Sequence, residues 1–586
     1  MIKQFFVEGF KAFAEPTYVN LDDLLILAGS NSSGKSTLVQ ALLLLSQTLE
    51  NPRSDVTLDL GGKYIQFAEF REIVYGRPKT REASFIVGFN LEMEEPDYLS
   101  LGLFDLRKIQ YAIHSRRRII SDSTPKVINN IKIRITFSAD LYGTSIVSSA
   151  NYEKSIQDLG KFKFEIERFG KKYKSNLEII PASETSVLGQ ELLGKLEELV
   201  IRSSIEGKRT AIRAPFRYWA EIFSQYGFHL EDIPEIGREV HSLFFDEKKG
   251  FIRVSEDDLG QLSEIINEII RYTYQKGISL SLLQPIQFDH FLIPTTSRFP
   301  GMDFRSAKLL DLLSSMFRDA LLEIRRYLRG IEYIGPLRAK PERAYLSTGT
   351  PVDIGNAGEN AVPILWLNQN EPVMCKTRIG EEPNERKLVK AVQDWLQEFG
   401  IAYSFHITKP KRVIYQAELE SSPGSKTMVT IADVGFGVSQ LLPVIVAGLS
   451  TRAGSTLILE QPEIHLHPRL QGKLADFLIC MVELGKKVIV ETHSEHLINM
   501  LRLRIAQDKS GILQKRIGII FVRNWQQISP TQRRAEDLDR HGSYNENLRV
   551  DEYGKIINWP SDFFPEATDL NEEILKAMMD KFPRGE

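Results

Sequence analysis

The sequence predicts an α/β fold in which an N-terminal and a C-terminal lobe form one head, with a large, mostly helical α+β insertion between them. A glycine-rich loop near the N-terminus lies between an apolar strand pattern and an apolar helix pattern. Three further apolar strand patterns return only far downstream, at 456–459, 487–490 and 516–521. Short, continuous apolar runs of this kind are typical of strands buried on both faces of a parallel sheet.

Size and composition limit the possible classes of protein. The 586 residues exceed what one core organises, so about two to four domains are expected. The apolar share of 42% and the charged share of 26% are ordinary for a globular protein. The net charge of −3 excludes a strongly basic, general nucleic-acid binder, although a local basic face stays open.

The chain carries no sign of secretion or membrane insertion. Cys375 and Cys480 are its two cysteines, and their spacing fits neither a disulfide framework nor a metal site, which favours a cytoplasmic location. No apolar stretch reaches the roughly 18 residues of a membrane span, so no membrane association is expected. The N-terminus has the pattern of a strand and not of a signal peptide.

Residues 29–36, Gly-Ser-Asn-Ser-Ser-Gly-Lys-Ser, spell a complete phosphate-binding loop in its strand–loop–helix context. Glycines allow successive N–H groups to converge on phosphate oxygens, and the helix adds its positive N-terminal end. The lysine is expected on the β- and γ-phosphates and the final serine on Mg²⁺. The alternative is a glycine-rich structural turn. The predicted nucleotide-binding residues of the loop are Gly29, Asn31, Ser32, Ser33, Gly34, Lys35, Ser36 and Thr37.

The pattern divides the chain into four segments: a lobe with the phosphate loop at 1–90, a mainly helical insertion at 91–329, a second lobe at 330–510, and a C-terminal strand and tail at 511–586. Charge runs in the insertion are interpreted as a solvated face. Further strands are expected at 2–9, 24–28, 132–137, 162–169 and 331–334. Helices are expected at 36–49, 190–205, 216–225, 257–275 and 306–329.

Four motifs in the second lobe are suited to complete a nucleotide-binding site together with the phosphate loop. Residues 433–440 form a glycine-rich turn that opens an apolar helix through 449, which is a second anion-binding end. The strand at 456–459 ends in Glu460, a position from which these sheets hold Mg²⁺. Another strand delivers His493, which can bond a γ-phosphate or the attacking water. Arg338, after Gly335-Pro336, is a candidate for contact with phosphate or nucleic acid.

Together these residues resemble the ABC-type ATPases of the SMC and OLD (overcoming lysogenization defect) group, especially single-chain bacterial AAA-type ATPases without the long coiled coil. The resemblance covers roughly 1–80 and 330–510, and it implies an ABC-type P-loop ATPase head that uses ATP and Mg²⁺. Residues 6–13 are also similar to the opening of this group, and residues 559–564 to a C-terminal tail of unknown function found on some members.

The resemblance also implies roles for individual residues. Glu460 takes the place of the Walker B carboxylate, 465–468 that of the D-loop, and His493 that of the switch histidine. The implied Mg²⁺ ligands are Ser36, Glu460 and Gln66. For Gln66, an ordinary polar residue of an edge strand is an equally good interpretation. The signature, which acts on the nucleotide of a second subunit, is implied to use Gly435, Gly437, Ser439 and Gln440.

The sequence departs from the group at two places. The group ends its Walker B strand in Asp-Glu, whereas this chain has Glu460-Gln461, and an amide cannot accept the proton of water as a carboxylate does. Either Glu463 or another carboxylate substitutes, or hydrolysis is slow; we favour slow hydrolysis. The catalytic candidates are therefore Glu460, Gln461, Glu463 and His493. In the signature, Phe436 takes the serine position, so Ser439 or backbone N–H groups must meet the γ-phosphate.

Two histidine patterns have other interpretations. His465 and His467 are spaced like a metal pair, but no cysteine or third ligand is near them in the sequence, so no metal site is expected. The run 493–496 resembles a hydrolase constellation only superficially, because no Gly-x-Ser-x-Gly motif accompanies it. A structural role is the alternative for His493.

The resemblance implies a homodimer, or a higher homo-oligomer, joined through the ATPase heads and acting as a switch or sensor in bacterial anti-phage defence. We find no acidic Toprim set and no HNH motif, so control of a separate effector such as a nuclease is expected, with nucleic acid bound directly or through that partner. The alternatives are an assembly scaffold without functional hydrolysis, an ATPase acting in DNA repair, or a cryptic nuclease centre in 95–325 or at the C-terminus.

Overall fold

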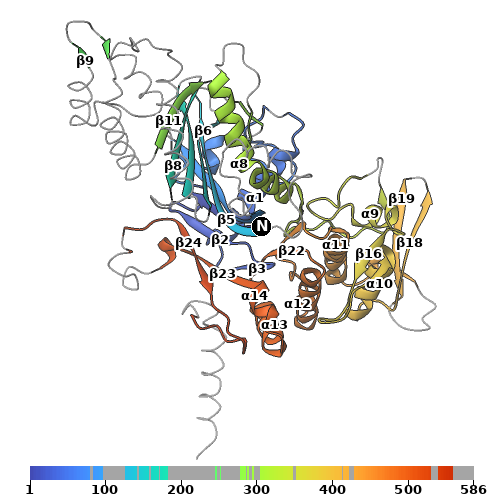
Figure 1. Ribbon diagram of the computed structural model, residues 1–586. Helices are drawn as coiled ribbons and strands as arrows, with labels where there is room; N and C mark the ends of the chain where they lie inside the picture. Colours follow the sequence, from blue (N-terminus) through green and yellow to red (C-terminus); the bar gives the residue numbers. More distant parts are fainter. Residues whose placement is uncertain are drawn as a thin grey trace, which may run out of the picture. The chain divides into compact units, whose positions relative to one another are not determined.

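The computed structural model divides the chain into two compact units (Figure 1). The first comprises Met1–Lys3, Arg53–Thr57 and Ile86–Arg325, and the second Gln4–Pro52, Leu58–Phe85 and Arg326–Glu586. The structure describes residues 1–53, 55–78, 83–96, 126–140, 144–156, 160–169, 172–181, 245–246, 251–252, 278–284, 287–289, 293–295, 304–346, 351–411, 413–420, 428–528, 537 and 539–558.

A six-stranded sheet in the order β14-β21-β22-β3-β23-β24 forms the centre of the second unit. Its first five strands are parallel, and β24 runs antiparallel to β23. Every residue of β3 and β21 is buried, as their continuous apolar runs predict. The α/β fold with two lobes is thereby confirmed. The strands are β14 (Ile331–Ile334), β21 (Thr456–Glu460), β22 (Lys487–Glu491), β3 (Leu24–Ala28), β23 (Ile517–Asn524) and β24 (Ser543–Leu548).

Two helices of this unit begin at a side-chain cap. The α12 helix (Pro468–Glu483) starts with proline in its first turn, after His467, whose side chain accepts from the Arg469 amide. The α13 helix (Glu495–Gln507) is capped by Ser494, which accepts from the Leu497 amide. The other helices here are α1 (Lys35–Glu50), α9 (Ala361–Leu367), α10 (Leu388–Glu398), α11 (Phe436–Ser450) and α14 (Ile512–Arg516).

Aromatic packing joins the helices of the second lobe. Trp395 of α10 is fully buried and meets Phe477 of α12 edge-on, with ring centroids 4.9 Å apart. Next to α9 and α10 lies a small sheet in the order β15-β19-β18, with β20 paired to β19. The remaining short elements are β15 (Tyr345–Leu346), β16 (Pro372–Cys375), β17 (Asn384–Lys387), β18 (Ser404–Lys411), β19 (Ile414–Glu420) and β20 (Val429–Thr430).

The strand expected at 2–9 is β1 (Ile2–Glu8), which pairs antiparallel with β2 (Thr17–Asn20). It ends one residue early because Gly9 has a φ of 68°, a left-handed conformation that turns the chain. The helix expected at 36–49 is α1, longer by one residue at each end.

The first unit contains an antiparallel sheet. The described part of the 91–329 insertion is mainly strand, whereas three of the four helices predicted for the insertion fall on residues that the structure does not describe. In β5, Ile131, Ile133, Ile135 and Phe137 are buried and alternate with more exposed residues, the period of a strand. Its strands are hydrogen-bonded neighbours in the following order: β4 (Ser84–Pro96), β5 (Lys126–Ala139), β6 (Ser145–Ile156), β7 (Gly160–Phe169), β8 (Lys172–Pro181) and β11 (Ile278–Gln284).

The other predictions for the insertion have separate outcomes. The strands expected at 132–137 and 162–169 fall inside β5 and β7, and the helix expected at 306–329 is α8 (Phe304–Arg329). The helices expected at 190–205, 216–225 and 257–275 lie outside the described residues. Short strand pairs complete this unit: β9 (Phe245–Asp246) with β10 (Phe251–Ile252), and β12 (Gln287–Asp289) with β13 (Ile293–Thr295).

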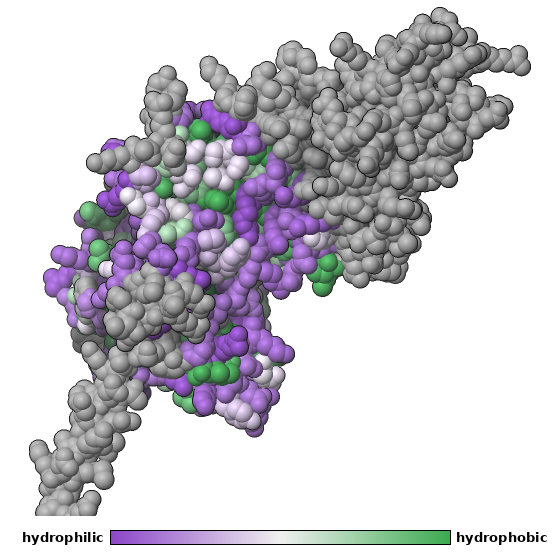
Figure 2. Space-filling view, turned by 90° about the vertical axis from the view of Figure 1, so that its left-hand side faces the viewer, coloured by the Kyte–Doolittle hydropathy of each residue, from purple (hydrophilic) through white to green (hydrophobic). Residues whose placement is uncertain are grey.

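The face of the molecule in Figure 2 is mostly hydrophilic where residues are described, with hydrophobic residues scattered over it. Among the helices that the structure describes, none is both long and apolar enough to span a membrane.

Candidate active site

The phosphate loop lies between β3 and α1 and depends on two glycines. Gly29 and Gly34 have φ angles of 142° and 108°, which residues with a side chain rarely adopt. A Cβ atom on Gly29 would lie 2.3 Å from the Val522 carbonyl oxygen, and one on Gly34 would lie 2.8 Å from the Ser543 Oγ. The loop is therefore packed against β23 and β24 as tightly as its backbone allows.

The Lys35 side chain is buried within the loop. Its Nζ donates to the carbonyl oxygens of Gly29 at 3.0 Å and Ser30 at 2.6 Å. Burial lowers the pKa of Lys35 to about 8, although the charge of Glu491 acts in the opposite direction. No residue of the first turn of α1 is itself acidic, so the helix contributes the positive end of its dipole to the loop. Both features favour an anion at the loop.

A carboxylate outside the predicted set of site residues lies beside the loop. The Ser36 hydroxyl donates to Glu491 Oε1 at 2.9 Å. Glu491 ends β22, the strand next to β3, where it is paired in register with Leu27. It is buried, and burial raises its pKa. The signal for this residue was present in the sequence, since it ends the strand pattern 487–490 just as Glu460 ends the pattern 456–459.

Glu460 ends β21 and accepts a hydrogen bond from β14, the neighbouring strand on the side away from β22. Its Oε1 accepts from the Tyr333 hydroxyl of β14 at 2.8 Å. Burial, together with the charge of Glu491, raises the pKa of Glu460 to about 7. Tyr333 was also missed, because the order β14-β21 cannot be deduced from the motifs.

Gln461 and Arg338 make hydrogen bonds that hold the backbone where β21 ends. Gln461 has a φ of 47°, and its amide N–H donates to the Glu491 carbonyl at 2.7 Å. The buried guanidinium of Arg338 donates to the carbonyls of Glu460 at 3.1 Å and Gln461 at 3.3 Å. Burial lowers the pKa of Arg338 to about 10. Arg338 therefore binds the backbone of this strand end, and its contact with phosphate or nucleic acid stays a prediction.

Glu463 joins the ends of β21 and β22. Its Oε1 accepts from the Thr492 hydroxyl at 2.7 Å and from the His493 backbone N–H at 3.0 Å. Burial lowers the pKa of the His493 imidazole, and the charge of Lys35 lowers it further. His493 is therefore within electrostatic range of the phosphate loop. The structure thus brings Lys35, Ser36, Glu460, Glu463, Glu491 and His493 to one edge of the sheet.

The signature residues lie on a different element. Gly435 precedes the first turn of α11, which has no acidic residue. A Cβ atom on Gly437 would lie 2.7 Å from the His465 carbonyl oxygen, so this turn lies directly against the end of the β21 loop. Ser439 and Gln440 are buried, and Gln440 Nε2 has no hydrogen-bond partner among the described residues. The α11 helix packs on α9, α10, β14 and β21.

Gln66, His465 and His467 lie in an isolated bridge, a turn and a helix cap, respectively, outside the strand ends described above. Gln66 forms an isolated β-bridge with Gly61, and its predicted role at Mg²⁺ stays a prediction. His467 caps α12, and His465 has a φ of 61°. Within the described ranges, no group of three or more His, Cys, Asp or Glu side chains is arranged to hold a metal.

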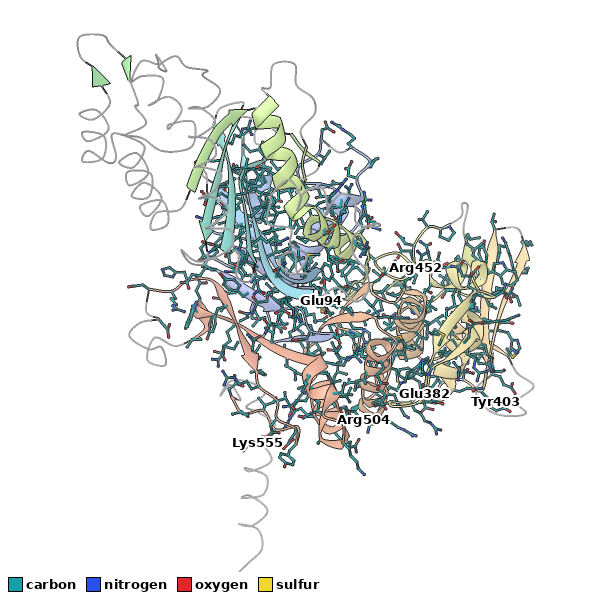
Figure 3. The ribbon with its side chains drawn as sticks, viewed as in Figure 1. Glu94, Glu382, Tyr403, Arg452, Arg504 and Lys555 are labelled. Carbon is teal, nitrogen blue, oxygen red and sulfur yellow. The ribbon has the colours of Figure 1, made fainter. Side chains whose placement is uncertain are left out.

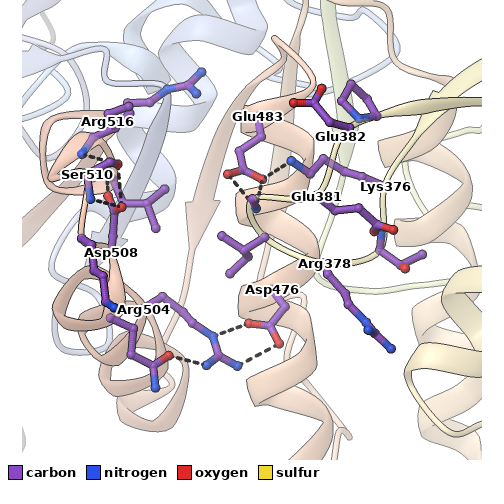
Figure 4. A pocket seen from close by; sticks show the side chains of 18 of the residues that line it. Lys376, Arg378, Glu381, Glu382, Asp476, Glu483, Arg504, Asp508, Ser510 and Arg516 are labelled. Carbon is purple, nitrogen blue, oxygen red and sulfur yellow. Dashed lines mark hydrogen bonds and ion pairs between the residues drawn. The ribbon is translucent and has the colours of Figure 1, made fainter.

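A charged cavity of about 980 Å³ lies in the same unit, lined by the loop at 376–383 and by residues of α12, α13 and α14. Figure 3 labels Arg504 of α13 and Glu382 from its wall. As Figure 4 shows, the charges are largely paired within the wall: Arg504 with Asp476 at 2.6 Å, and Lys376 with Glu483 at 2.6 Å. Its lining includes no residue of the phosphate loop.

Comparison with known proteins identifies the domain. A family model described as an AAA ATPase domain matches residues 1–73 and 367–498. The matched segments include the phosphate loop, the 435–440 turn, Glu460 and His493. Over these two segments the chain is similar to an ATPase domain of the AAA type, and its fold is that of a P-loop ATPase built from an N- and a C-terminal lobe. No curated protein matches the chain.

Several solved structures are similar at low identity. The Smc head domain of Pyrococcus furiosus, with an extended coiled coil and bound to the C-terminal domain of ScpA, has 11% identity and a TM-score of 0.33, covering 98% of this chain and 99% of that one. An SmcHead bound to the C-winged helix domain of ScpA has 10% identity and a TM-score of 0.33, covering 95% and 99%. The SMC head domain of Thermotoga maritima has 8% identity and a TM-score of 0.29, covering 94% and 99%.

Proposed function

We propose that this chain is an ATP-dependent switch in which two copies hold ATP and Mg²⁺ between them and hydrolyse the nucleotide slowly. The observation that carries the proposal is Gln461 at the end of β21. An amide is neutral and cannot take a proton from water, so the position usual for a general base contributes none. ATP bound at the loop would then persist, and the ATP-bound form would be long-lived.

The carboxylates next to Gln461 are each held by hydrogen bonds. Glu463 is buried, and its Oε1 is held by the Thr492 hydroxyl and the His493 N–H. Glu460 accepts from Tyr333 on the strand beyond it. These bonds engage Oε1 of each carboxylate and orient it, whereas Oε2 of Glu463 has no hydrogen-bond partner among the described residues. When bound, Mg²⁺ would neutralise phosphate charge and hold the phosphates in place, with Ser36 and a strand-end carboxylate as its protein ligands.

The start of α11 supports a second copy in the complex. The α11 helix has fifteen residues, and its first turn, which carries no acidic side chain, presents backbone N–H groups as donors. These donors suit a phosphate. The residues 435–440 of one copy would complete the site formed by the phosphate loop of the other, with Gly435, Gly437, Ser439 and Gln440 as its contacts.

The test combines turnover with assembly. We expect slow steady-state hydrolysis by the wild-type protein, faster hydrolysis by Gln461→Glu, and ATP-dependent dimerisation in light scattering that Lys35→Ala abolishes. Brisk wild-type hydrolysis that Gln461→Glu leaves unchanged would refute the slow switch. A molar mass that stays monomeric with saturating ATP would refute the shared site.

Gln461 also favours a second candidate, an assembly scaffold in which hydrolysis has no role. Its distinguishing result would be normal assembly with a non-hydrolysable ATP analogue, followed by no disassembly when ATP replaces the analogue. In that case Lys35→Ala would abolish assembly, while Glu463→Gln and His493→Ala would assemble and disassemble like the wild type.

We further propose that the switch controls a separate effector, such as a nuclease, in anti-phage defence, with nucleic acid bound directly or through that partner. The proposal depends on the resemblance of the motifs to the SMC and OLD group. Its test is copurification of the chain with the products of neighbouring genes, with and without ATP, followed by phage plating of cells that express them. Recovery of the chain alone under both conditions, with plating unchanged by Lys35→Ala, would contradict it.

A further inference from the structure

The strand order places Glu491 closer to the phosphate loop than Glu460. The strand β22, which ends in Glu491, is paired directly with β3, whereas β21, which ends in Glu460, lies beyond β22. Neighbouring strands are roughly 4.8 Å apart, so the backbone of Glu460 lies about one strand further from the loop.

The hydrogen bond from Ser36 organises this position for a cation. Because the hydroxyl proton is donated to Glu491 Oε1 at 2.9 Å, the lone pairs of Ser36 Oγ stay available to a metal ion. Glu491 is 4% exposed, and its Oε2 has no hydrogen-bond partner among the residues the structure describes. A buried carboxylate oxygen without a partner costs free energy, which a cation beside it would recover.

Glu460 is engaged differently. Its Oε1 accepts from the Tyr333 hydroxyl of β14, the strand on the side away from β3. Mg²⁺ binds through oxygen ligands, commonly one or two carboxylates together with substrate phosphates. The residues present fit that requirement, with Ser36 and Glu491 in hydrogen-bond contact beside Lys35.

We propose that Glu491, and not Glu460, is the carboxylate that holds Mg²⁺ together with Ser36 when ATP is bound. This inference rests on the proposed binding of ATP at the phosphate loop. In this proposal Glu491, which precedes Thr492 and His493, holds the metal ion. The sequence motif assigns that role to Glu460 at the end of β21. Glu460 then contributes to the site through its neighbour Glu491 and its hydrogen bond with Tyr333.

The experiment measures ATP affinity by calorimetry in Mg²⁺ and in EDTA for the wild type, Glu491→Gln and Glu460→Gln. We expect Mg²⁺ to strengthen wild-type binding, and Glu491→Gln to weaken the Mg²⁺-dependent part by roughly 10- to 100-fold while binding in EDTA is retained. Glu460→Gln should keep the Mg²⁺ effect. Both substitutions preserve side-chain size, and circular dichroism verifies folding.

A second readout follows the metal directly. With Mn²⁺ as the probe, electron paramagnetic resonance should show the nucleotide-dependent bound Mn²⁺ lost in Glu491→Gln and in Ser36→Ala, and kept in Glu460→Gln. An unchanged Mg²⁺ effect and Mn²⁺ signal in Glu491→Gln would overturn the inference, as would their loss in Glu460→Gln alone. Absence of ATP binding by the wild type in both buffers would instead refute the proposed function, and this inference with it.

Discussion

Glu460→Gln should stabilise the folded protein at high pH. Glu460 is 7% exposed, and its burial raises its pKa from 4.5 to about 7. Glutamine has nearly the same size and keeps an oxygen that can accept from the Tyr333 hydroxyl, but it carries no charge. The substitution therefore removes the cost of an ionised, buried carboxylate while leaving its packing in place.

The expected size follows from the pKa. A tenfold change in proton affinity corresponds to about 1.4 kcal/mol, so a pKa of about 7 in place of 4.5 makes the ionised Glu460 roughly 3 kcal/mol costlier in the folded state. The raised pKa favours folding at low pH, and that contribution is lost as the pH rises through about 7. The variant should thus be more stable by roughly 3 kcal/mol at pH 8, with the difference vanishing near pH 4.5.

The assay is chemical denaturation followed by tryptophan fluorescence from pH 5 to pH 8.5, without nucleotide and with EDTA (roughly the span over which a group with the pKa of Glu460 titrates). Comparing the variant with the wild type cancels the titration of groups that do not interact with Glu460, such as Lys35. Tyr333→Phe is the matched control: it removes the hydrogen bond that favours the ionised form, so it should lower stability at high pH more in the wild type than in Glu460→Gln. A stability difference that does not change with pH, or a less stable Glu460→Gln at pH 8, would refute the reasoning.

Three further outcomes are expected. Gly29→Ala should abolish nucleotide binding in calorimetry and lower the thermal midpoint, because its Cβ would lie 2.3 Å from a carbonyl oxygen of β23; unchanged affinity would contradict the tight loop. Glu463→Ala should cost roughly 1–3 kcal/mol in denaturant unfolding, since the Thr492 hydroxyl and the His493 N–H lose their acceptor. Trp395→Ala should cost roughly 3–5 kcal/mol in the same measurement, because the side chain is fully buried, and a loss below about 1 kcal/mol would be too small for a core residue.

Local pattern was sufficient for the elements of the ATPase lobes. The strand β14 has the predicted bounds, and the helix α1 differs from its prediction by one residue at each end. These segments are predictable because strand, loop and helix are neighbours in sequence and their burial is set by their own apolar runs. The strands of the insertion were harder to predict. In β5, apolar residues alternate with polar ones over most of the strand, yet only 132–137 was assigned to a strand.

Two features can be read from the order of amino acids alone: a phosphate loop between a strand and a helix, and an amide, Gln461, at the position usual for a general base. Which carboxylate lies beside the loop depends on how distant segments pack together. The contact of Ser36 with Glu491 joins residues 455 positions apart, and that of Tyr333 with Glu460 joins residues 127 positions apart. The physical reason is the strand order β14-β21-β22-β3, which brings the carboxyl ends of parallel strands to one edge in a sequence that no local motif records.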